Sequence, residues 1–211
     1  MKRYDILFVD FMAEDTHRYY CNRIIKEVNK YSSTFVVEKN EYMDYAEDDN
    51  HKIVYIKTKE TVNNYPIVAR VNVLYNFFNT LKVIRGYEFK KIIVLGYDPV
   101  MFSFIFPILY RKGDIFLVQH HQLDEVNKSK IKQKLWSIYK DEVNHILLDE
   151  AIIDGVSQQF MIKKNKLFFF PIPLIENAKL LKETENNKIK VLCISGSNDK
   201  KQLKDFVRYY G

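Results

Sequence analysis

Glycine, proline and cysteine are scarce in this chain of 211 residues, which has six glycines, five prolines and two cysteines. The scarcity of glycine and proline, together with an apolar share of 47%, excludes a disordered or collagen-like chain. Cys21 and Cys193 lie far apart without metal-type spacing, which is typical of reduced packing residues in a cytoplasmic protein. The sequence therefore predicts a globular chain without a disulfide framework or a metal site.

Long hydrophobic runs are also missing. The longest, residues 100–110, is well short of the roughly 20 residues that a membrane-spanning helix needs, and residues 1–4 lead into a strand without the features of a signal peptide. The net charge is +6, but the lysines are spread along the chain and do not indicate a nucleic-acid partner. An anionic membrane surface or a phosphorylated ligand suits this charge equally well.

The loop after the first expected strand, residues 10–15, contains no glycine. A glycine-rich turn is what lets a backbone approach the phosphates of a dinucleotide. We therefore expect no dinucleotide site there and no tightly bound cofactor.

Residues 91–122 form the central β-α-β pattern of the sequence. An apolar strand at 92–95 ends at Gly96, Asp98 and Pro99 start an apolar helix, and a second strand follows at 115–118. Such units build parallel sheets. We predict an α/β fold with a doubly wound, Rossmann-like parallel sheet, with strands near residues 5, 35, 54, 93, 116, 152 and 169 and helices on both faces.

Three other helices are predicted from periodicity and capping residues. One begins at Pro66, and its stripe of Ile67, Val71, Leu74, Phe78 and Leu81 is expected to face the sheet. A second covers 128–144, with Ile131, Leu135, Ile138 and Tyr139 directed inward. Ser157 is expected to cap a third.

Candidate site residues follow from the rule that ligands bind at the carboxyl ends of parallel strands. His121, with His120 as its alternate, is the candidate catalytic residue, because imidazole titrates near neutrality and can stabilise developing charge. Asp10, Asp15 and Asp98 are candidate acceptor-binding residues, although Asp98 also suits a helix cap. Ser157 is a candidate donor or anion contact. The remaining histidines, among them His145, are interpreted as ordinary surface or helix residues.

Several segments, in this order, resemble the amino-terminal half of glycosyltransferases with the two-domain GT-B fold. FLVQHHQ is similar to a strand that ends in an active-site histidine, and AIIDGVSQQF to a short strand followed by a serine-capped helix. KLFFFPIPL resembles a strand that enters a proline-containing link, and KIKVLCISGSNDKKQLKDF the first strand, turn and helix of the second domain.

The resemblance implies three parts: an acceptor-type domain over 1–175, a linker over 176–187, and at 188–211 the first β-α unit of an incomplete second domain. Residues 188–211 could instead be a last unit packed on the first domain. The implied function is sugar transfer from a nucleotide-sugar donor to a glycan or lipid-linked acceptor in cell-surface polysaccharide synthesis. A second domain or partner chain would have to supply the donor site, because no Glu follows Glu185. The alternative is a non-catalytic α/β binding or regulatory module.

Lys132, Trp136 and Lys140 are spaced four residues apart and are therefore neighbours on one helix surface. Tryptophan and lysine together suit the headgroup region of an anionic bilayer. The sequence thus predicts a cytoplasmic protein with possible peripheral contact at the inner face of the cell membrane. A solvated basic face is the other interpretation of this line.

Overall fold

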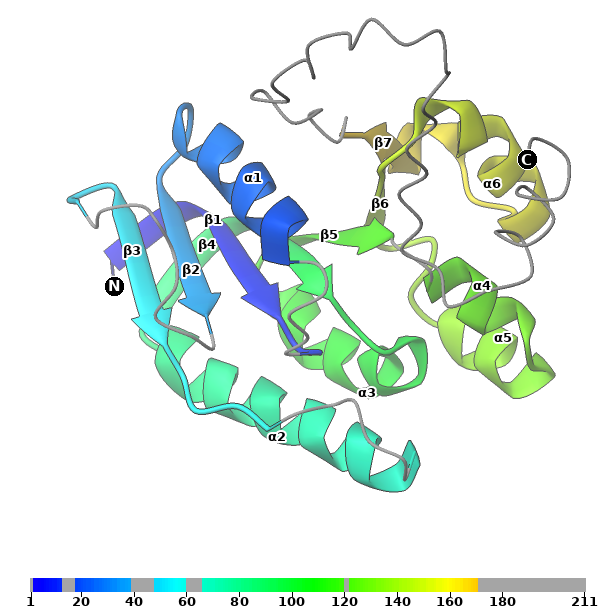
Figure 1. The fold of residues 1–211 in the computed structure, drawn as a ribbon, viewed down its shortest axis with the longest axis horizontal. Coiled ribbons are helices and arrows are strands. Elements are labelled where there is room, and N and C mark those ends of the chain that lie inside the picture. Colours follow the sequence, from blue (N-terminus) through cyan, green and yellow to red (C-terminus); the bar gives the residue numbers. More distant parts are fainter. Residues whose placement is uncertain (1, 13–17, 39–47, 60–65, 120–121, 171–211) are drawn as a thin grey trace, which may run out of the picture. The chain divides into compact units, whose positions relative to one another are not determined.

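The computed structural model describes residues 2–12, 18–38, 48–59, 66–119 and 122–170 (Figure 1). The chain divides into two units, Met1–Leu174 and Ile175–Gly211, and every element below belongs to the first. The expected linker and second β-α unit lie outside the described residues.

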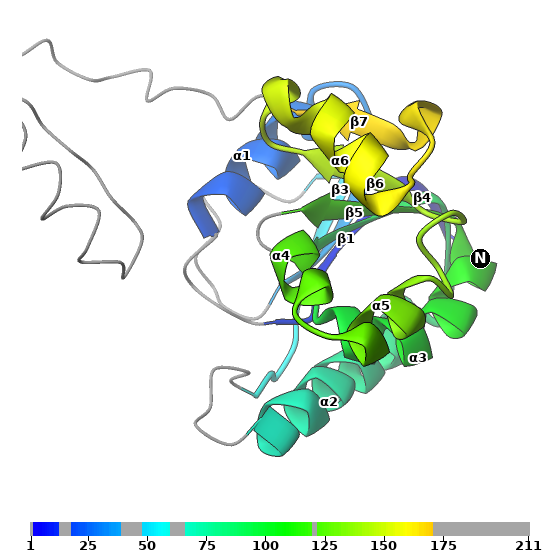
Figure 2. The ribbon, with the colours of Figure 1, turned by 90° about the vertical axis from the view of Figure 1, so that its right-hand side faces the viewer.

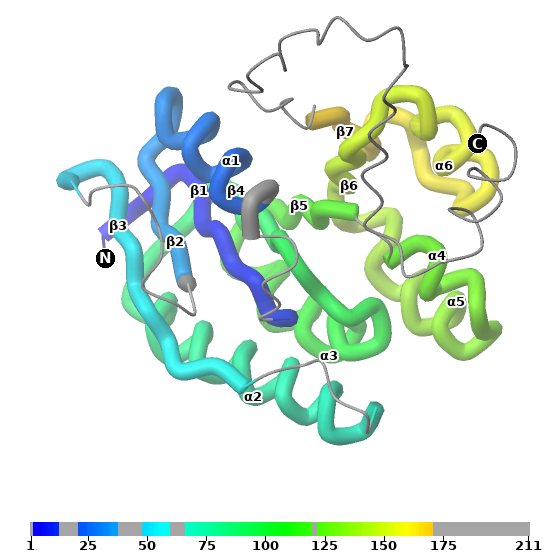
Figure 3. The backbone as a smooth tube through the Cα atoms, viewed as in Figure 1, coloured from blue at the N-terminus to red at the C-terminus, as the bar shows by residue number. Residues whose placement is uncertain are grey.

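Seven parallel strands form one sheet in the order β3-β2-β1-β4-β5-β6-β7 (Figure 3). They span Lys2–Asp10 (β1), Thr34–Glu38 (β2), His51–Tyr55 (β3), Tyr87–Gly96 (β4), Asp114–Gln119 (β5), Asn144–Leu147 (β6) and Leu167–Phe169 (β7). The order runs outward in both directions from the β1–β4 pair, as in doubly wound sheets. The predicted α/β, Rossmann-like parallel fold is confirmed.

Helices cover both faces of the sheet (Figure 2). Helix α1 (Arg18–Asn29) lies on one face, and α2 (Pro66–Ile84), α3 (Pro99–Leu109) and α5 (Lys130–Trp136) lie on the other. The shorter helices are α4 (Gln122–Asn127), α6 (Ile153–Phe160) and the 3-10 turns η2 (Tyr110–Lys112), η3 (Glu150–Ile152) and η4 (Lys164–Lys166). Two buried apolar clusters, one on each face, form the core.

The central β-α-β unit is β4-α3-β5, as the sequence indicated. The Asp98 carboxylate accepts hydrogen bonds from the amides of Val100 and Met101 at 2.9 and 2.8 Å, and Pro99 opens the helix. Its buried face includes Phe102, Ile105 and Leu109. Capping and burial together therefore fix this helix beneath the sheet.

The strand expected near residue 152 is wrong. Asp149 accepts a hydrogen bond from the Ala151 amide and starts the 3-10 turn η3, which continues into α6, so this segment is helical. The sixth strand is Asn144–Leu147, which pairs with β5 and β7.

The stripe predicted to bury α2 is only partly right, since Leu74 and Leu81 pack partly buried against the core but its other three residues are exposed. Its residues Ile67, Val71 and Phe78 are 76%, 57% and 52% exposed, whereas Val73 and Phe77 are buried. The buried face also carries Asn76 and Thr80. Helix α2 is apolar on nearly all sides, so hydrophobic periodicity could not choose which side faces the sheet.

The helix predicted over 128–144 is shorter than expected. Helix α5 ends at Trp136 and is followed by turns up to residue 143. Tyr139 is buried as predicted, but Ile131 and Ile138 are exposed. Among the described residues, none of the helices has both the length and the hydropathy that crossing a bilayer requires.

Candidate functional site

The strand order reverses between β1 and β4, and ligands of doubly wound sheets bind at the carboxyl ends of such a strand pair. β1 ends at Asp10, which pairs with Gly96 at the end of β4 after a register shift. Just beyond, the amide of Phe11 donates to the carbonyl of Gly96 at 3.0 Å. These contacts hold the two strand ends together and define the candidate site.

Gly96 leaves room for the Asp10 carboxylate. A Cβ atom at Gly96 would lie only 2.4 Å from Oδ1 of Asp10, closer than real Cβ contacts allow. The same oxygen accepts a hydrogen bond from the amide of Met12 at 2.9 Å. The carboxylate is half-buried and lies against the end of β4, so its position depends on the glycine.

Asp98, the second carboxylate of this rim, is half-buried two residues beyond Gly96. Its Oδ1 atom caps α3, which confirms the cap interpretation. Asp10 and Asp98 therefore follow the two central strands of the sheet at the same edge. Carboxylates in such positions accept hydrogen bonds, and the hydroxyl groups of a sugar are suitable donors.

Asn76, which the sequence analysis missed, joins two loops of this edge. Its amide Nδ2 donates to the carbonyls of Phe11 and Lys59 at 3.1 and 3.0 Å, and its Oδ1 accepts from the amide of Lys59 at 2.8 Å. Asn79 adds a bond to the carbonyl of Lys57. Helix α2 thus fixes the loops after β1 and β3, and a polar residue in an apolar helix was the available signal.

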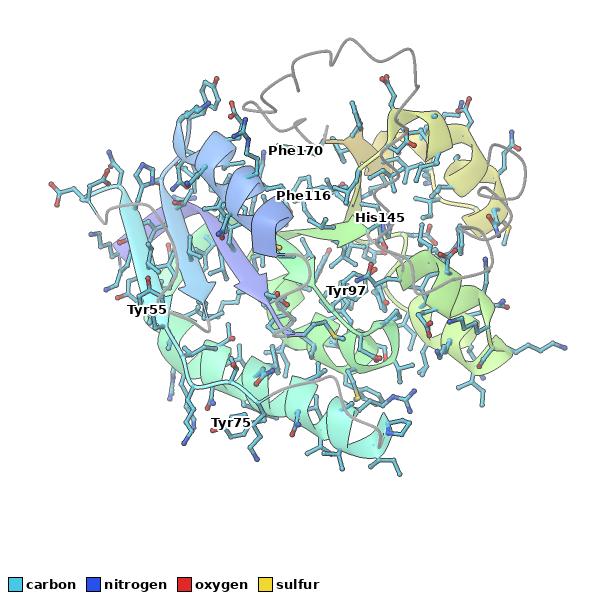
Figure 4. All side chains as sticks on the ribbon, viewed as in Figure 1. Tyr55, Tyr75, Tyr97, Phe116, His145 and Phe170 are labelled. Atoms are coloured by element: carbon cyan, nitrogen blue, oxygen red, sulfur yellow. The ribbon has the colours of Figure 1, made fainter. Side chains whose placement is uncertain are left out.

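A buried polar network supports the end of β5, and two of its members, His145 and Tyr97, are labelled in Figure 4. Nε2 of His145 lies 2.9 Å from the carbonyl of Lys140, so this nitrogen carries the proton. Nδ1 then accepts from Nε2 of Gln119 at 2.8 Å, and Oε1 of Gln119 accepts from the Tyr97 hydroxyl at 3.0 Å. Gln119 is the last residue of β5, so the network holds the strand where the histidine pair follows.

Burial has the largest influence on the pKa of both ionisable groups in this network. It lowers the pKa of His145 to about 4, and it raises the pKa of the Tyr97 hydroxyl far above its ordinary value. His145 is fully buried in β6, so its interpretation as a surface or helix residue is wrong. Near neutral pH both groups are uncharged, and the network is structural rather than a source of charge.

His120, His121 and Asp15 lie outside the described residues. Ser157 does not cap a helix, because it lies inside α6 and its hydroxyl donates to the carbonyl of Ile162 at 2.8 Å. That hydroxyl bonds at the end of its own helix, whereas the amides at the start of α6 lie a turn away. The predicted anion contact assumed a serine at the start of the helix, and α6 does not have one there.

The side chains of Lys132, Trp136 and Lys140 make contacts within the fold, which corrects the membrane contact predicted for them. Trp136 is only 4% exposed and packs edge-on against Phe160 with ring centroids 5.4 Å apart. Nζ of Lys140 donates to the carbonyls of Phe160 and Met161, which close the last turn of α6. Nζ of Lys132 pairs with Glu125 at 2.7 Å.

Within the described parts of the chain, no group of three or more His, Cys, Asp or Glu side chains is placed to hold a metal ion. The comparisons with known proteins add no family to this geometry: no family model matches the sequence, and no curated protein matches it.

Proposed function

We propose that this chain is a glycosyltransferase or its acceptor-binding half, which uses the β1–β4 edge to bind a glycan or a lipid-linked sugar. The observation that carries the proposal is the Asp10 carboxylate against Gly96 at the reversal of strand order. A carboxylate favours sugar hydroxyls at this position and repels phosphate, and residues 10–15 lack the glycines of a phosphate-binding loop.

In this proposal His121, with His120 as its alternate, acts on the reacting sugar, since the pair directly follows Gln119 at the end of β5. Asp10, Asp15 and Asp98 orient the acceptor by accepting hydrogen bonds from its hydroxyls. The nucleotide-sugar donor is a substrate bound by a second domain or partner chain. Such an enzyme would work in the cytoplasm on cell-surface polysaccharide precursors.

The test is saturation-transfer NMR on the full chain with neutral oligosaccharides and, separately, with uridine and guanosine diphosphate sugars. We expect oligosaccharide signals that Asp10→Asn weakens by about tenfold or more, because a hydrogen bond to a charged group contributes about 1.5–3 kcal/mol. Asp114→Asn is the matched control, since Asp114 is exposed at the opposite end of β5.

Equal binding by both variants, or tight binding of a nucleotide sugar without any saccharide binding, would refute the acceptor site. If no sugar ligand binds and a macromolecular partner does, the alternative of a non-catalytic binding module gains support. Transfer assays with His121→Ala and His120→Ala, in the presence of the donor-binding part, then test the catalytic assignment.

A further inference from the structure

The outer surface of α2 and α3 is unusually apolar. Residues Ile67, Val68, Val71 and Phe78 of α2, and Phe104, Ile108 and the adjoining Tyr110 of α3 and η2, are all among the exposed large hydrophobic residues. The two helices pack next to each other on the same face of the sheet (Figures 1 and 2). Exposed large apolar side chains gathered on two adjoining helices are typical of an interaction site.

The charges on these two helices have one sign only. Residues 66–86 contain Arg70, Lys82 and Arg85 and no acidic residue, and residues 99–113 contain Arg111 and Lys112 and no acidic residue. Elsewhere the chain is rich in acidic residues, since it has 27 in total. An apolar surface with exclusively positive flanks is complementary to an anionic lipid bilayer.

A polar pocket of about 300 Å³ lies where η2, which follows α3, meets the starts of β1 and β4. It is lined by Arg3, Arg111, Lys112, Tyr87, Phe89 and Glu88. Arg111 directly follows exposed Tyr110, and Arg85 precedes Tyr87 by two residues, so the chain itself joins the pocket to both helices. Arg3 stands opposite Glu88 in the β1–β4 pairing, so the cations of this pocket that remain for an anionic partner are Arg111 and Lys112.

We propose that the outer face of α2 and α3 docks on an anionic bilayer, with Arg111 and Lys112 at the end of α3 against the lipid phosphates. Ile67, Phe104 and Ile108 then enter the headgroup layer, and the basic residues of the two helices and η2 meet the lipid headgroups. Nucleic acid would use the cations but leave these apolar side chains without a partner. This docking face is separate from the β1–β4 edge and from Lys132, Trp136 and Lys140.

The experiment is vesicle flotation of the full chain at low ionic strength. Vesicles contain phosphatidylcholine alone or an equal mixture of phosphatidylcholine and phosphatidylserine. We expect binding only to the anionic vesicles. Arg111→Glu with Lys112→Glu should weaken it more than tenfold, since each near-surface cation contributes about fivefold. The matched control is Lys163→Glu with Lys164→Glu, a consecutive basic pair that is exposed elsewhere on the chain and should bind normally.

A second pair of variants tests the apolar contact. Ile67→Ser with Phe104→Ser should reduce binding, whereas Tyr31→Ser with Ile152→Ser, two exposed apolar residues outside this surface, should not. Phe104→Trp should report entry into lipid by a blue shift in emission on adding anionic vesicles. The buried Trp136 gives a constant background, and Tyr31→Trp should show no shift.

No flotation with anionic vesicles, or equal losses in both charge variants, would overturn the proposal. So would full binding by the double serine variant of Ile67 and Phe104 together with unshifted emission from the Phe104→Trp variant, since that result describes electrostatic adsorption without docking. Binding to single-stranded RNA but not to vesicles would assign the basic pocket to nucleic acid instead. Circular dichroism of each variant separates loss of binding from loss of fold.

Discussion

At the scale of single residues, His145 gives the protein a pH dependence of its own. Burial lowers its pKa in the folded chain from 6.5 to about 4. The unfolded chain therefore takes up a proton as the pH falls below 6.5, while the folded chain does not until the pH nears 4. Stability is full above pH 6.5 and declines between these values, by about 3 kcal/mol in all.

Two carboxylates with lowered pKa values change the stability of the fold at lower pH than His145 does. Hydrogen bonds from Lys90 and Ser33 lower the pKa of Asp5 to about 2, and those from Lys128 and Lys132 do the same for Glu125. The stability that these carboxylates give is present above their ordinary pKa values of 3.8 and 4.5 and is lost as the pH falls toward 2. Among the described groups with a shifted pKa, His145 is the one whose change in protonation falls between pH 4.5 and 6.5.

We predict that His145→Asn removes most of the decline between pH 6.5 and 4.5. The asparagine can still accept from Gln119, but it loses the bond to the Lys140 carbonyl, so stability at pH 7 should fall by about 1–3 kcal/mol. Urea unfolding at a series of pH values measures both effects. An unchanged slope in the variant would mean that other groups cause the decline.

Sequence reasoning could not identify this network. Tyr97 and Gln119 are 22 residues apart along the chain and Gln119 and His145 are 26 apart, so their hydrogen bonds exist only once β4, β5 and β6 are packed. Strand periodicity places His145 on one side of a strand but does not state whether a helix covers that side. The turns after α5 provide the cover here.

At the scale of elements, α2 offers a direct test of helix orientation. Val73 is buried and Val71 is 57% exposed on the same helix, so the same substitution can be compared on both sides. We predict that Val73→Ala lowers the free energy of unfolding by about 1–3 kcal/mol through lost burial and a cavity, and Val71→Ala by less than about 0.5 kcal/mol. Denaturant unfolding of both variants measures the difference. A larger loss at Val71 would reverse the assigned orientation.

The strands other than β6 were predictable, because their cores are short apolar runs between polar residues, as at 92–95 and 115–118. The errors have local physical causes. Asp149 caps residues 150–152, which therefore form a 3-10 helix instead of a strand. Helix α2 has apolar residues on every side, so its orientation depends on packing against the sheet and not on its own pattern. Trp136 is buried instead of lying on the predicted surface, because its ring packs against Phe160 of α6.

At the scale of the whole molecule, the sequence could predict those parts of the candidate site that follow from the order of parallel strands. A β-α-β pattern with parallel strands places Asp10 and Asp98 at one edge, and the structure has them there. The close approach of Asp10 to Gly96 and the loop contacts of Asn76 depend on tertiary packing. The sequence showed a glycine and an asparagine but not what they would face.

The order of strands also predicts how the molecule opens. β1 and β4 lie at the centre, and Leu7 and Val94 are fully buried there, whereas β3 and β7 are the edges of the described sheet and Phe168 is exposed. Edge strands exchange through local openings, because one side has no neighbour, while central strands require global unfolding. We predict that the amides of Leu7 and Val94 exchange slowest, with free energies equal to that of global unfolding. The amides of Val54 and Phe168 should exchange at least about tenfold faster.

Native-state hydrogen exchange in rising, sub-denaturing urea measures this prediction. Exchange of Leu7 and Val94 should accelerate with the urea dependence of global unfolding, because the whole buried surface must open. Exchange at Val54 and Phe168 should be almost independent of urea at low concentrations, because little surface is exposed in a local opening. Measuring at two pH values confirms that opening is in equilibrium. Exchange of β1 at the rate of β7 would contradict a single cooperative sheet centred on β1 and β4, since the centre would then open as easily as the edge.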